Sequence, residues 1–351
     1  MSEARKAIIG ISCGDLNGVG LEVIMKTFAN SQMLEICTPV LFASSKAVAY
    51  HRKALELENF SFNIIKKLDQ LNDQRANLLQ VWDEEVKMEF GKEDPAVGKY
   101  ALKSLEAATK ALKEGTIDAL VTAPINKASI QSEDFKFKGH TDYLEAKFDS
   151  KAIMVLVNED LRMALNTVHI SLAEVPKAIQ KEQIVNKITT LAASLKKDFL
   201  IGRAKIAVLS LNPHGGDNGL IGKEEIEIIE PAIKEAQENN NLVFGPFAAD
   251  GFFGSKAYQQ YDAILAMYHD QGLAPFKALS FGAGVNYSGG LPIIRTSPDH
   301  GTGFSIAGKG EANESSFRAA VYLACDLVKH RKLSNELTKN PLKSKKGRKE
   351  Y

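Results

Sequence analysis

The sequence has little cysteine, almost no net charge and no long hydrophobic segment at its start. Its three cysteines, Cys13, Cys37 and Cys325, are far apart and include no Cys-x-x-Cys pair. An odd number of scattered cysteines argues against a disulfide framework and fits a reducing cytoplasm. The first apolar run, Ala7–Cys13, is too short for a signal peptide or a membrane span. We therefore expect a cytoplasmic protein with no membrane partner.

The formal net charge is +1 over 351 residues. The chain as a whole therefore has no field that would gather nucleic acid or anionic membranes, and any anion must be recognised by a local pocket. One basic segment remains at the C-terminus, residues 336–351, where lysine is frequent and large apolar residues are few. We interpret it as a solvated tail. The alternative is a nucleic-acid-binding arm, which deletion of residues 339–351 would test.

Short β-like runs alternate with longer helical patterns along the chain, which is typical of parallel sheets with crossover helices. A chain of this length favours two α/β lobes. The first lobe is expected to comprise residues 1–130 and 285–335, and the second residues 131–284. The predicted strands include 7–13, 39–43, 78–82 and 119–122, and the predicted helices are 20–29, 100–114, 184–200, 224–239 and 316–330. Residues 250–310 are rich in glycine and are predicted to form loops and short strands around a site.

Three histidines follow three separate strand-like runs, Met163–His169, Ala207–His214 and Ala263–His269. In an open α/β sheet, ligands bind just beyond the carboxyl ends of the strands, so residues far apart in sequence can meet there. A single histidine at a strand end more often has a structural role. Three neutral imidazoles in one crevice would instead form an open site for Zn²⁺ or another divalent ion. Asp250 and Asp270 are expected to orient imidazoles as hydrogen-bond acceptors.

A second group of residues indicates an anionic ligand. The segment Gly139-His140-Thr141-Asp142 is expected to lead into a helix, where Thr141 would act as the cap and free N–H groups would face an anion. Lys277, Asn286 and Arg295 follow further along the chain, and together they could neutralise and fork around a phosphate. The alternative for Lys277 or Arg295 is an exposed charge or a surface ion pair.

A third signal is a loop of small residues, Asp299–Gly303 continuing to Ile306–Gly310. Its backbone could wrap closely around a flat polar ligand such as an adenosine. The positions expected to contact this ligand are Gly301, Thr302, Ala307 and Gly308. The segment Gly14–Gly20 is also glycine-rich, but it matches neither G-x-G-x-x-G nor a phosphate-binding P-loop. It is predicted to be a tight turn between a strand and a helix.

Together these motifs resemble the 4-hydroxythreonine-4-phosphate dehydrogenase family of pyridoxal phosphate biosynthesis. The resemblance extends from about residue 8 to about residue 330. Any one of the motifs could occur by chance, but the ordered set is specific. The motifs are Thr122-Ala-Pro-Ile-Asn-Lys127, Gly139-His-Thr-Asp142, Leu211-Asn-Pro-His214, Tyr268-His-Asp-Gln-Gly-Leu273, Asp299-His-Gly-Thr302 and Ile306-Ala-Gly-Lys-Gly310.

The resemblance implies a two-lobed, three-layer α/β/α fold like that of isocitrate and isopropylmalate dehydrogenases. It also implies a homodimer with the active site at the subunit interface. A divalent metal ion (zinc, cobalt or magnesium) would be bound by His169, His214 and His269, drawn from both subunits. The implied contacts to a phosphorylated substrate are His140, Thr141, Lys277, Asn286 and Arg295. The cofactor would be NAD, held by the loop Ile306–Gly310.

The implied reaction is oxidation of the C3 hydroxyl of 4-phosphooxy-L-threonine by NAD⁺, followed by loss of CO₂ to give 3-amino-2-oxopropyl phosphate. Lys277 and Asp250 are the candidates for the proton transfers. Ser305 stands where the wider group often has a carboxylate, so NADP is also possible. One alternative is a related metal-dependent dehydrogenase acting on another phosphorylated or carboxylated hydroxy acid. Another is a non-catalytic protein that binds metal or phosphate.

Overall fold

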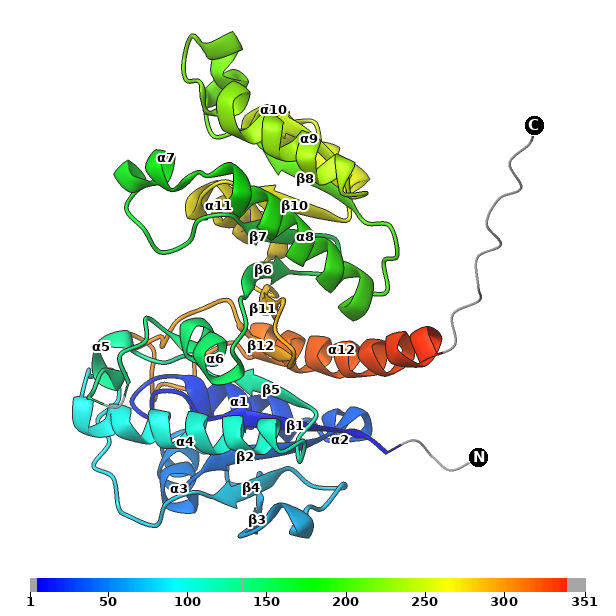
Figure 1. Ribbon diagram of the computed structural model, residues 1–351. Coiled ribbons are helices and arrows are strands. Elements are labelled where there is room, and N and C mark those ends of the chain that lie inside the picture. Colours follow the sequence, from blue (N-terminus) through cyan, green and yellow to red (C-terminus); the bar gives the residue numbers. More distant parts are fainter. Residues whose placement is uncertain (1–4, 134, 340–351) are drawn as a thin grey trace.

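The computed structural model describes residues 5–133 and 135–339, whose twelve strands form one mixed sheet (Figure 1). The strand order is β3-β4-β2-β1-β5-β12-β11-β6-β7-β10-β8-β9. The strands are β1 (Ala7–Ser12), β2 (Cys37–Ala43), β3 (Asn63–Ile65), β4 (Asn77–Gln80), β5 (Ala119–Thr122), β6 (Ile153–Val157), β7 (Arg162–Leu165), β8 (Lys205–Leu209), β9 (Leu242–Phe247), β10 (Ala263–Ala266), β11 (Val285–Gly289) and β12 (Arg295–Pro298). The α-helices are α1 (Gly20–Ala29), α2 (Met33–Ile36), α3 (Ser45–Ala54), α4 (Pro95–Lys113), α5 (Lys127–Ile130), α6 (His140–Phe148), α7 (Val175–Ala178), α8 (Lys181–Asp198), α9 (Glu230–Glu238), α10 (Ala249–Gly254), α11 (His269–Ser280) and α12 (Ser315–Lys339).

The two halves of the sheet run in opposite directions. The strands from β3 to β12 in the sheet order are parallel to one another, and so are those from β7 to β9. Between the halves, β11 pairs antiparallel with both β12 and β6, and β6 pairs antiparallel with β7. The sheet continues through both halves, so the division into lobes at residues 131 and 285 stays a prediction.

Helices cover both faces of the sheet, which confirms the predicted α/β/α layers. On one face α1, α8 and α12 pack over a buried core that extends through both halves. On the other face α4 covers the first half and α11 the second, each over a smaller core of its own. Strand side chains alternate between the two faces. In β11, for example, Val285 and Tyr287 join the continuous core, so Asn286 and Ser288 point to the face of α4 and α11.

Three predicted helices have different ends in the structure. The helix expected at residues 184–200 is α8, Lys181–Asp198. Helix α4 begins at Pro95 instead of residue 100, because the Asp94 carboxylate accepts the Ala96 N–H at 2.8 Å and proline is favourable in the first turn. Helix α12 continues to Lys339 through a stretch without glycine or proline. Residues 336–339 of the predicted tail are therefore helical, and residues 340–351 lie outside the described part of the chain.

Two other expectations were wrong in detail. The predicted helix 224–239 consists of a π-helical turn, Glu225–Ile229, followed by α9. Pro231 lacks the N–H that would continue a regular ladder, which accounts for the wider turn. The segment 250–310 contains α10 and the twelve-residue helix α11, not only loops and strands. Gly272 and Pro275 lie inside α11 and obscured its helical pattern.

All three cysteines are buried free thiols. Within residues 5–133 and 135–339, no helix is both long and apolar enough to span a membrane.

His51, on α3, gives the fold a predicted pH dependence. Its side chain is 1% exposed, its Nε2 donates to the Leu16 carbonyl at 2.7 Å, and burial lowers its pKa to about 4. Between pH 6.5 and 4 the unfolded state binds a proton that the native state does not, so stability should rise with pH across this window. Because a shift of one pKa unit corresponds to about 1.4 kcal/mol, His51 should change the free energy of unfolding by about 3 kcal/mol across this window.

The check is the free energy of unfolding of wild type and His51→Gln, measured by denaturant titration at several pH values from 4 to 7. We expect the slope against pH to become shallower in the variant. Equal slopes in the two proteins would show that His51 does not titrate as described.

Candidate active site

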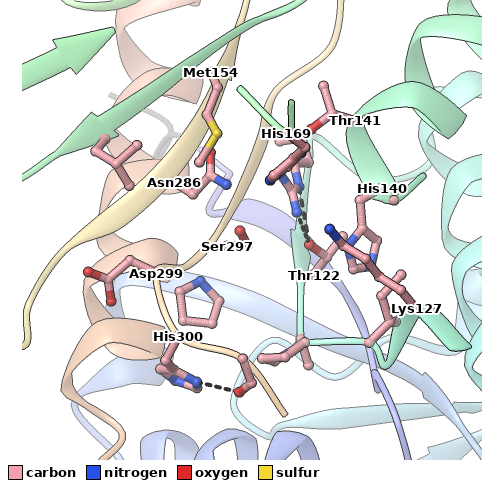
Figure 2. Close-up of a pocket in the computed structure, with 18 of the residues that line it drawn as sticks. Thr122, Lys127, His140, Thr141, Met154, His169, Asn286, Ser297, Asp299 and His300 are labelled. Atoms are coloured by element: carbon pink, nitrogen blue, oxygen red, sulfur yellow. Dashed lines mark hydrogen bonds between the residues drawn. The ribbon is translucent and has the colours of Figure 1, made fainter. Parts of the chain in front are cut away.

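A cavity of about 250 Å³ lies over the middle strands of the sheet, between α5 and α6 on one side and α11 on the other. Its walls come from β5, β12, β11 and β6, which are consecutive in the middle of the sheet. Figure 2 shows Lys127 and His140 on one side of the cavity and Asn286 and Asp299 on the other. Thus the cavity gathers residues from segments that are more than 100 positions apart in sequence.

Arg295 is the buried cation of this cavity. It begins β12, is 3% exposed, and lines the cavity. Its Nε and Nη2 donate to Thr122 Oγ1 at 3.1 and 2.7 Å, and its Nη1 donates to Ser288 Oγ at 3.2 Å. Burial lowers its pKa to about 10, so the guanidinium stays charged at neutral pH. In the described part of the chain no carboxylate forms an ion pair with it.

Three further polar atoms of the cavity are buried without a hydrogen-bond partner among the described residues. They are His140 Nε2, Asn286 Oδ1 and His300 Nε2. Burial, followed by the charge of Arg295, lowers the pKa of His140 well below its usual value, so this imidazole is neutral. Leaving buried polar atoms unpaired costs free energy. A ligand that carries both donors and acceptors would remove this cost.

Helix α6 places its first turn at the cavity, as expected, but Thr141 is not its cap. The helix begins at His140, Gly139 occupies the cap position, and no side chain caps the helix there. A glycine at this position leaves the first turn accessible, and Thr141 lines the cavity instead.

The structure brings together two of the three predicted metal ligands. The rings of His169 and His269 have centroids 5.9 Å apart and are tilted by 44°. The Nδ1 atom of His269 lies 2.7 Å from Asp270 Oδ1, which matches the predicted orienting role of Asp270 and leaves Nε2 available. Desolvation and then the charge of Lys127 lower the pKa of His169, which favours the neutral imidazole that binds metals.

His214 lies elsewhere, in a second cavity of about 560 Å³ that it shares with Asp250, Tyr268 and Asp270. It begins a run of five residues with left-handed backbone angles, in which His214 has φ 52°. Across residues 5–133 and 135–339, no three histidine, cysteine, aspartate or glutamate side chains are close enough to hold one metal ion. The imidazoles of His169 and His269 could supply two ligands of a metal site. Metal binding by all three histidines stays a prediction.

The loop before His214 is held by a carboxylate that the sequence did not single out. Glu225 is 1% exposed, and its Oε1 accepts the N–H groups of Leu211 and Asn212 at 2.7 and 2.8 Å. The Asn212 side-chain amide donates to Glu225 Oε2 at 2.9 Å. Glu225 belongs to the π-helical turn, a feature often found near functional sites. No periodicity in the sequence would have revealed it.

The predicted cofactor loop packs against the turn between β1 and α1. Thr302 offers its carbonyl to the Val19 N–H at 2.9 Å, and a Cβ on Gly18 would lie 2.7 Å from that same oxygen. The close approach explains the glycine and agrees with the predicted tight turn. Ala307 is buried, and Gly308 has φ +75° with Phe90 packed against it. Gly301 alone of the four predicted positions lines the cavity of Arg295.

The two candidates for proton transfer lie outside this cavity. Lys277 is exposed on α11, one turn beyond Leu273, which does line the cavity. Asp250 is exposed at the second cavity with His214. By contrast, Thr122 and Lys127 line the cavity, although the motif that contains them was the only reason to single them out.

Comparisons with known proteins agree with the motif analysis. A family model described as pyridoxal phosphate biosynthetic protein PdxA matches residues 35–324. The 4-hydroxythreonine-4-phosphate dehydrogenase of Bacteroides thetaiotaomicron is 52% identical over 343 residues, which cover 97% of this chain and 94% of that protein. A putative D-threonate 4-phosphate dehydrogenase of Oceanobacillus iheyensis is 37% identical, covering 93% of this chain and 99% of its own. The crystal structure of the Klebsiella pneumoniae 4-hydroxythreonine-4-phosphate dehydrogenase matches with a TM-score of 0.79 at 32% identity, covering 93% of this chain and 99% of that one.

Proposed function

This chain belongs to the PdxA family of pyridoxal phosphate biosynthetic proteins, and we propose that it is a 4-hydroxythreonine-4-phosphate dehydrogenase. It would oxidise the C3 hydroxyl of 4-phosphooxy-L-threonine with NAD⁺. The resulting 3-oxo acid would then lose CO₂ to give 3-amino-2-oxopropyl phosphate. The isocitrate/isopropylmalate-dehydrogenase-like fold of the family is the fold observed here.

One observation supports the proposed substrate most strongly. Arg295 is a fully buried cation whose protein partners are the neutral hydroxyls of Thr122 and Ser288. Keeping such a charge buried is unfavourable unless an anion compensates it. A phosphate does so and accepts several hydrogen bonds, including those of a guanidinium fork. We therefore assign the phosphate end of the substrate to Arg295, with His140, Thr141 and Asn286 around it.

The reacting carbon would lie toward His169, which lines the same cavity, and toward His269, whose ring centroid is 5.9 Å from that of His169. A divalent cation held by these imidazoles would supply Lewis acidity toward an alcohol or ketone oxygen. The protein contributes orientation: the cation of Arg295 fixes one end of the substrate, which places the hydroxyl against the histidines. Zinc, cobalt and magnesium are the candidate ions, and imidazole ligands favour the first two.

His214, Asp250 and Lys277 take part only if a second copy of the chain completes the site, so we also propose a homodimer. Large apolar side chains are exposed in the segment that carries His214, including Leu220 at 83% and Ile221 at 48%. Exposed apolar groups of this size are typical of surfaces that pair with another protein. Lys277 or Asp250 would then reach the substrate hydroxyl across the interface and accept its proton.

A nicotinamide cofactor follows from membership in a dehydrogenase family, and we propose NAD. The loop Asp299–Gly310 would bind its adenosine half, because its first residues border the substrate cavity and His300 Nε2 is unpaired there. NADP stays possible, because Ser305 provides no carboxylate that would repel a 2′-phosphate. A cytoplasmic location and the absence of a nucleic-acid partner are likewise kept as predictions.

The direct test is the absorbance of NADH formed from NAD⁺ and 4-phosphooxy-L-threonine. Parallel reactions with D-threonate 4-phosphate, isopropylmalate and tartrate separate this activity from those of related dehydrogenases. We expect the highest kcat/KM with 4-phosphooxy-L-threonine. A higher value with another acid would move the assignment to that substrate, and no turnover of any of them would favour a non-catalytic binding protein.

A further inference from the structure

We propose that Thr122 is a positioning residue for phosphate recognition. Its hydroxyl, with that of Ser288, holds the Arg295 guanidinium in a fixed orientation without neutralising its charge. This inference rests on the proposed function, because it concerns how the assigned phosphate end is held. Thr122 is not among the substrate contacts that the family resemblance implies.

Protein groups accept only some of the hydrogen bonds that the Arg295 guanidinium can donate. A guanidinium has five N–H donors in a fixed plane. Thr122 Oγ1 accepts one from Nε and one from Nη2, and Ser288 Oγ accepts one from Nη1. One N–H remains on each terminal nitrogen. This remaining pair suits two phosphate oxygens, because such bidentate contacts are a common mode of arginine–phosphate binding.

The choice of a hydroxyl as acceptor is what leaves the charge available. A second buried arginine of the same chain shows the other arrangement, since Arg331 donates to the carboxylate oxygens of Asp198 at 2.5 and 3.0 Å. That ion pair is complete without any ligand. Thr122 and Ser288 satisfy donors of Arg295 but carry no charge. An incoming anion therefore meets an uncompensated cation that is already oriented.

The sheet fixes both hydroxyls. Thr122 ends β5, is 0% exposed and lies next to β12, which pairs with β5 in parallel. Ser288 lies on β11, which pairs with β12 on its other side. Threonine is branched at Cβ, so its side chain has few accessible rotamers. The guanidinium is thus held from both sides by neighbouring strands, which position groups more accurately than loops do.

The test uses Thr122→Val, which keeps the shape of the side chain and removes the oxygen. Thr296→Val is the matched control: Thr296 is also 0% exposed and follows Arg295, but its hydroxyl donates to the Ala320 carbonyl on the opposite face. Each protein is titrated calorimetrically with inorganic phosphate, and KM and kcat are measured with 4-phosphooxy-L-threonine. Thr122→Ser, which keeps the oxygen, is the rescue variant.

We expect Thr122→Val to weaken phosphate binding and raise KM by about 10- to 100-fold, the loss of two hydrogen bonds to a charged group, while kcat changes much less. Thr122→Ser should recover most of the affinity, and Thr296→Val should bind phosphate like wild type. If Thr122→Val does not fold, Thr122→Ala compared with Thr122→Ser measures the same oxygen.

The outcomes separate this inference from the proposed function. If removal of Arg295 abolishes phosphate binding while Thr122→Val and Thr122→Ala match Thr296→Val, Thr122 has no positioning role and the phosphate assignment stands. If removal of Arg295 leaves phosphate binding intact, the phosphate assignment itself is wrong. An equal fall of kcat and affinity in Thr122→Val that serine does not rescue would indicate general structural damage and would also overturn the inference.

Discussion

Replacing Arg295 with methionine should reduce kcat/KM for 4-phosphooxy-L-threonine by about 10²- to 10³-fold, because removing one partner of a buried charged contact costs about 2–5 kcal/mol. Most of the loss should appear in KM. At the same time the variant should unfold at the same or a higher temperature than wild type. The reason is that the wild-type fold buries a guanidinium that no carboxylate of the described residues compensates, and desolvating such a charge is unfavourable.

The matched control is Arg331→Met. Arg331 is 9% exposed and its partner Asp198 is 1% exposed. The Asp198 carboxylate also accepts a hydrogen bond from the Tyr287 hydroxyl, so these contacts join α8, α12 and β11. Breaking such a pair costs about 3–5 kcal/mol, and thermal unfolding with calorimetric detection would show a clear loss of stability. If Arg295→Met were destabilised as strongly as Arg331→Met, Arg295 would be a structural residue and not a phosphate site.

Replacing His269 or His169 with alanine should weaken binding of Zn²⁺ or Co²⁺ by more than the 10- to 100-fold that loss of a supporting residue typically causes. The two rings are 5.9 Å apart, so both variants should behave alike. Asp270→Asn should have a smaller effect of the same sign, because Asp270 only orients His269. Competition with a chromophoric chelator measures the affinity without relying on turnover.

His214→Ala distinguishes the two possible ligand sets. A loss as large as in the other two variants, in a protein that sediments as a dimer, would support a third ligand supplied by a second copy. Unchanged affinity would exclude His214 from the metal site. Wild-type affinity in all three alanine variants would contradict the metal assignment altogether.

Sequence patterns predicted the strands that precede the three histidines because the relevant signals are local. The runs ending at His169, His214 and His269 are strands β7, β8 and β10, and these are parallel neighbours in the sheet. The convergence of the histidines did not follow from that placement. Each histidine is separated from its strand by a different connection, and the left-handed turn at His214 takes this side chain to another cavity.

The role of Thr122 could not be predicted for a different reason. It depends on a contact with Arg295, 173 positions away, which exists only because β5 and β12 become neighbours in the sheet. The same holds for Glu225, whose carboxylate binds the backbone ahead of His214. Charge patterns along the chain likewise could not distinguish Arg295, which has no carboxylate partner among the described residues, from Arg331, which has one.

The most direct test of the phosphate assignment is a crystal structure of the protein with 4-phosphooxy-L-threonine and Zn²⁺, using anomalous scattering to locate the metal. We predict the phosphate against the two remaining N–H groups of Arg295, with His140 and Asn286 alongside, and the metal between His169 and His269. A phosphate bound away from Arg295, with the guanidinium still held only by Thr122 and Ser288, would contradict the account.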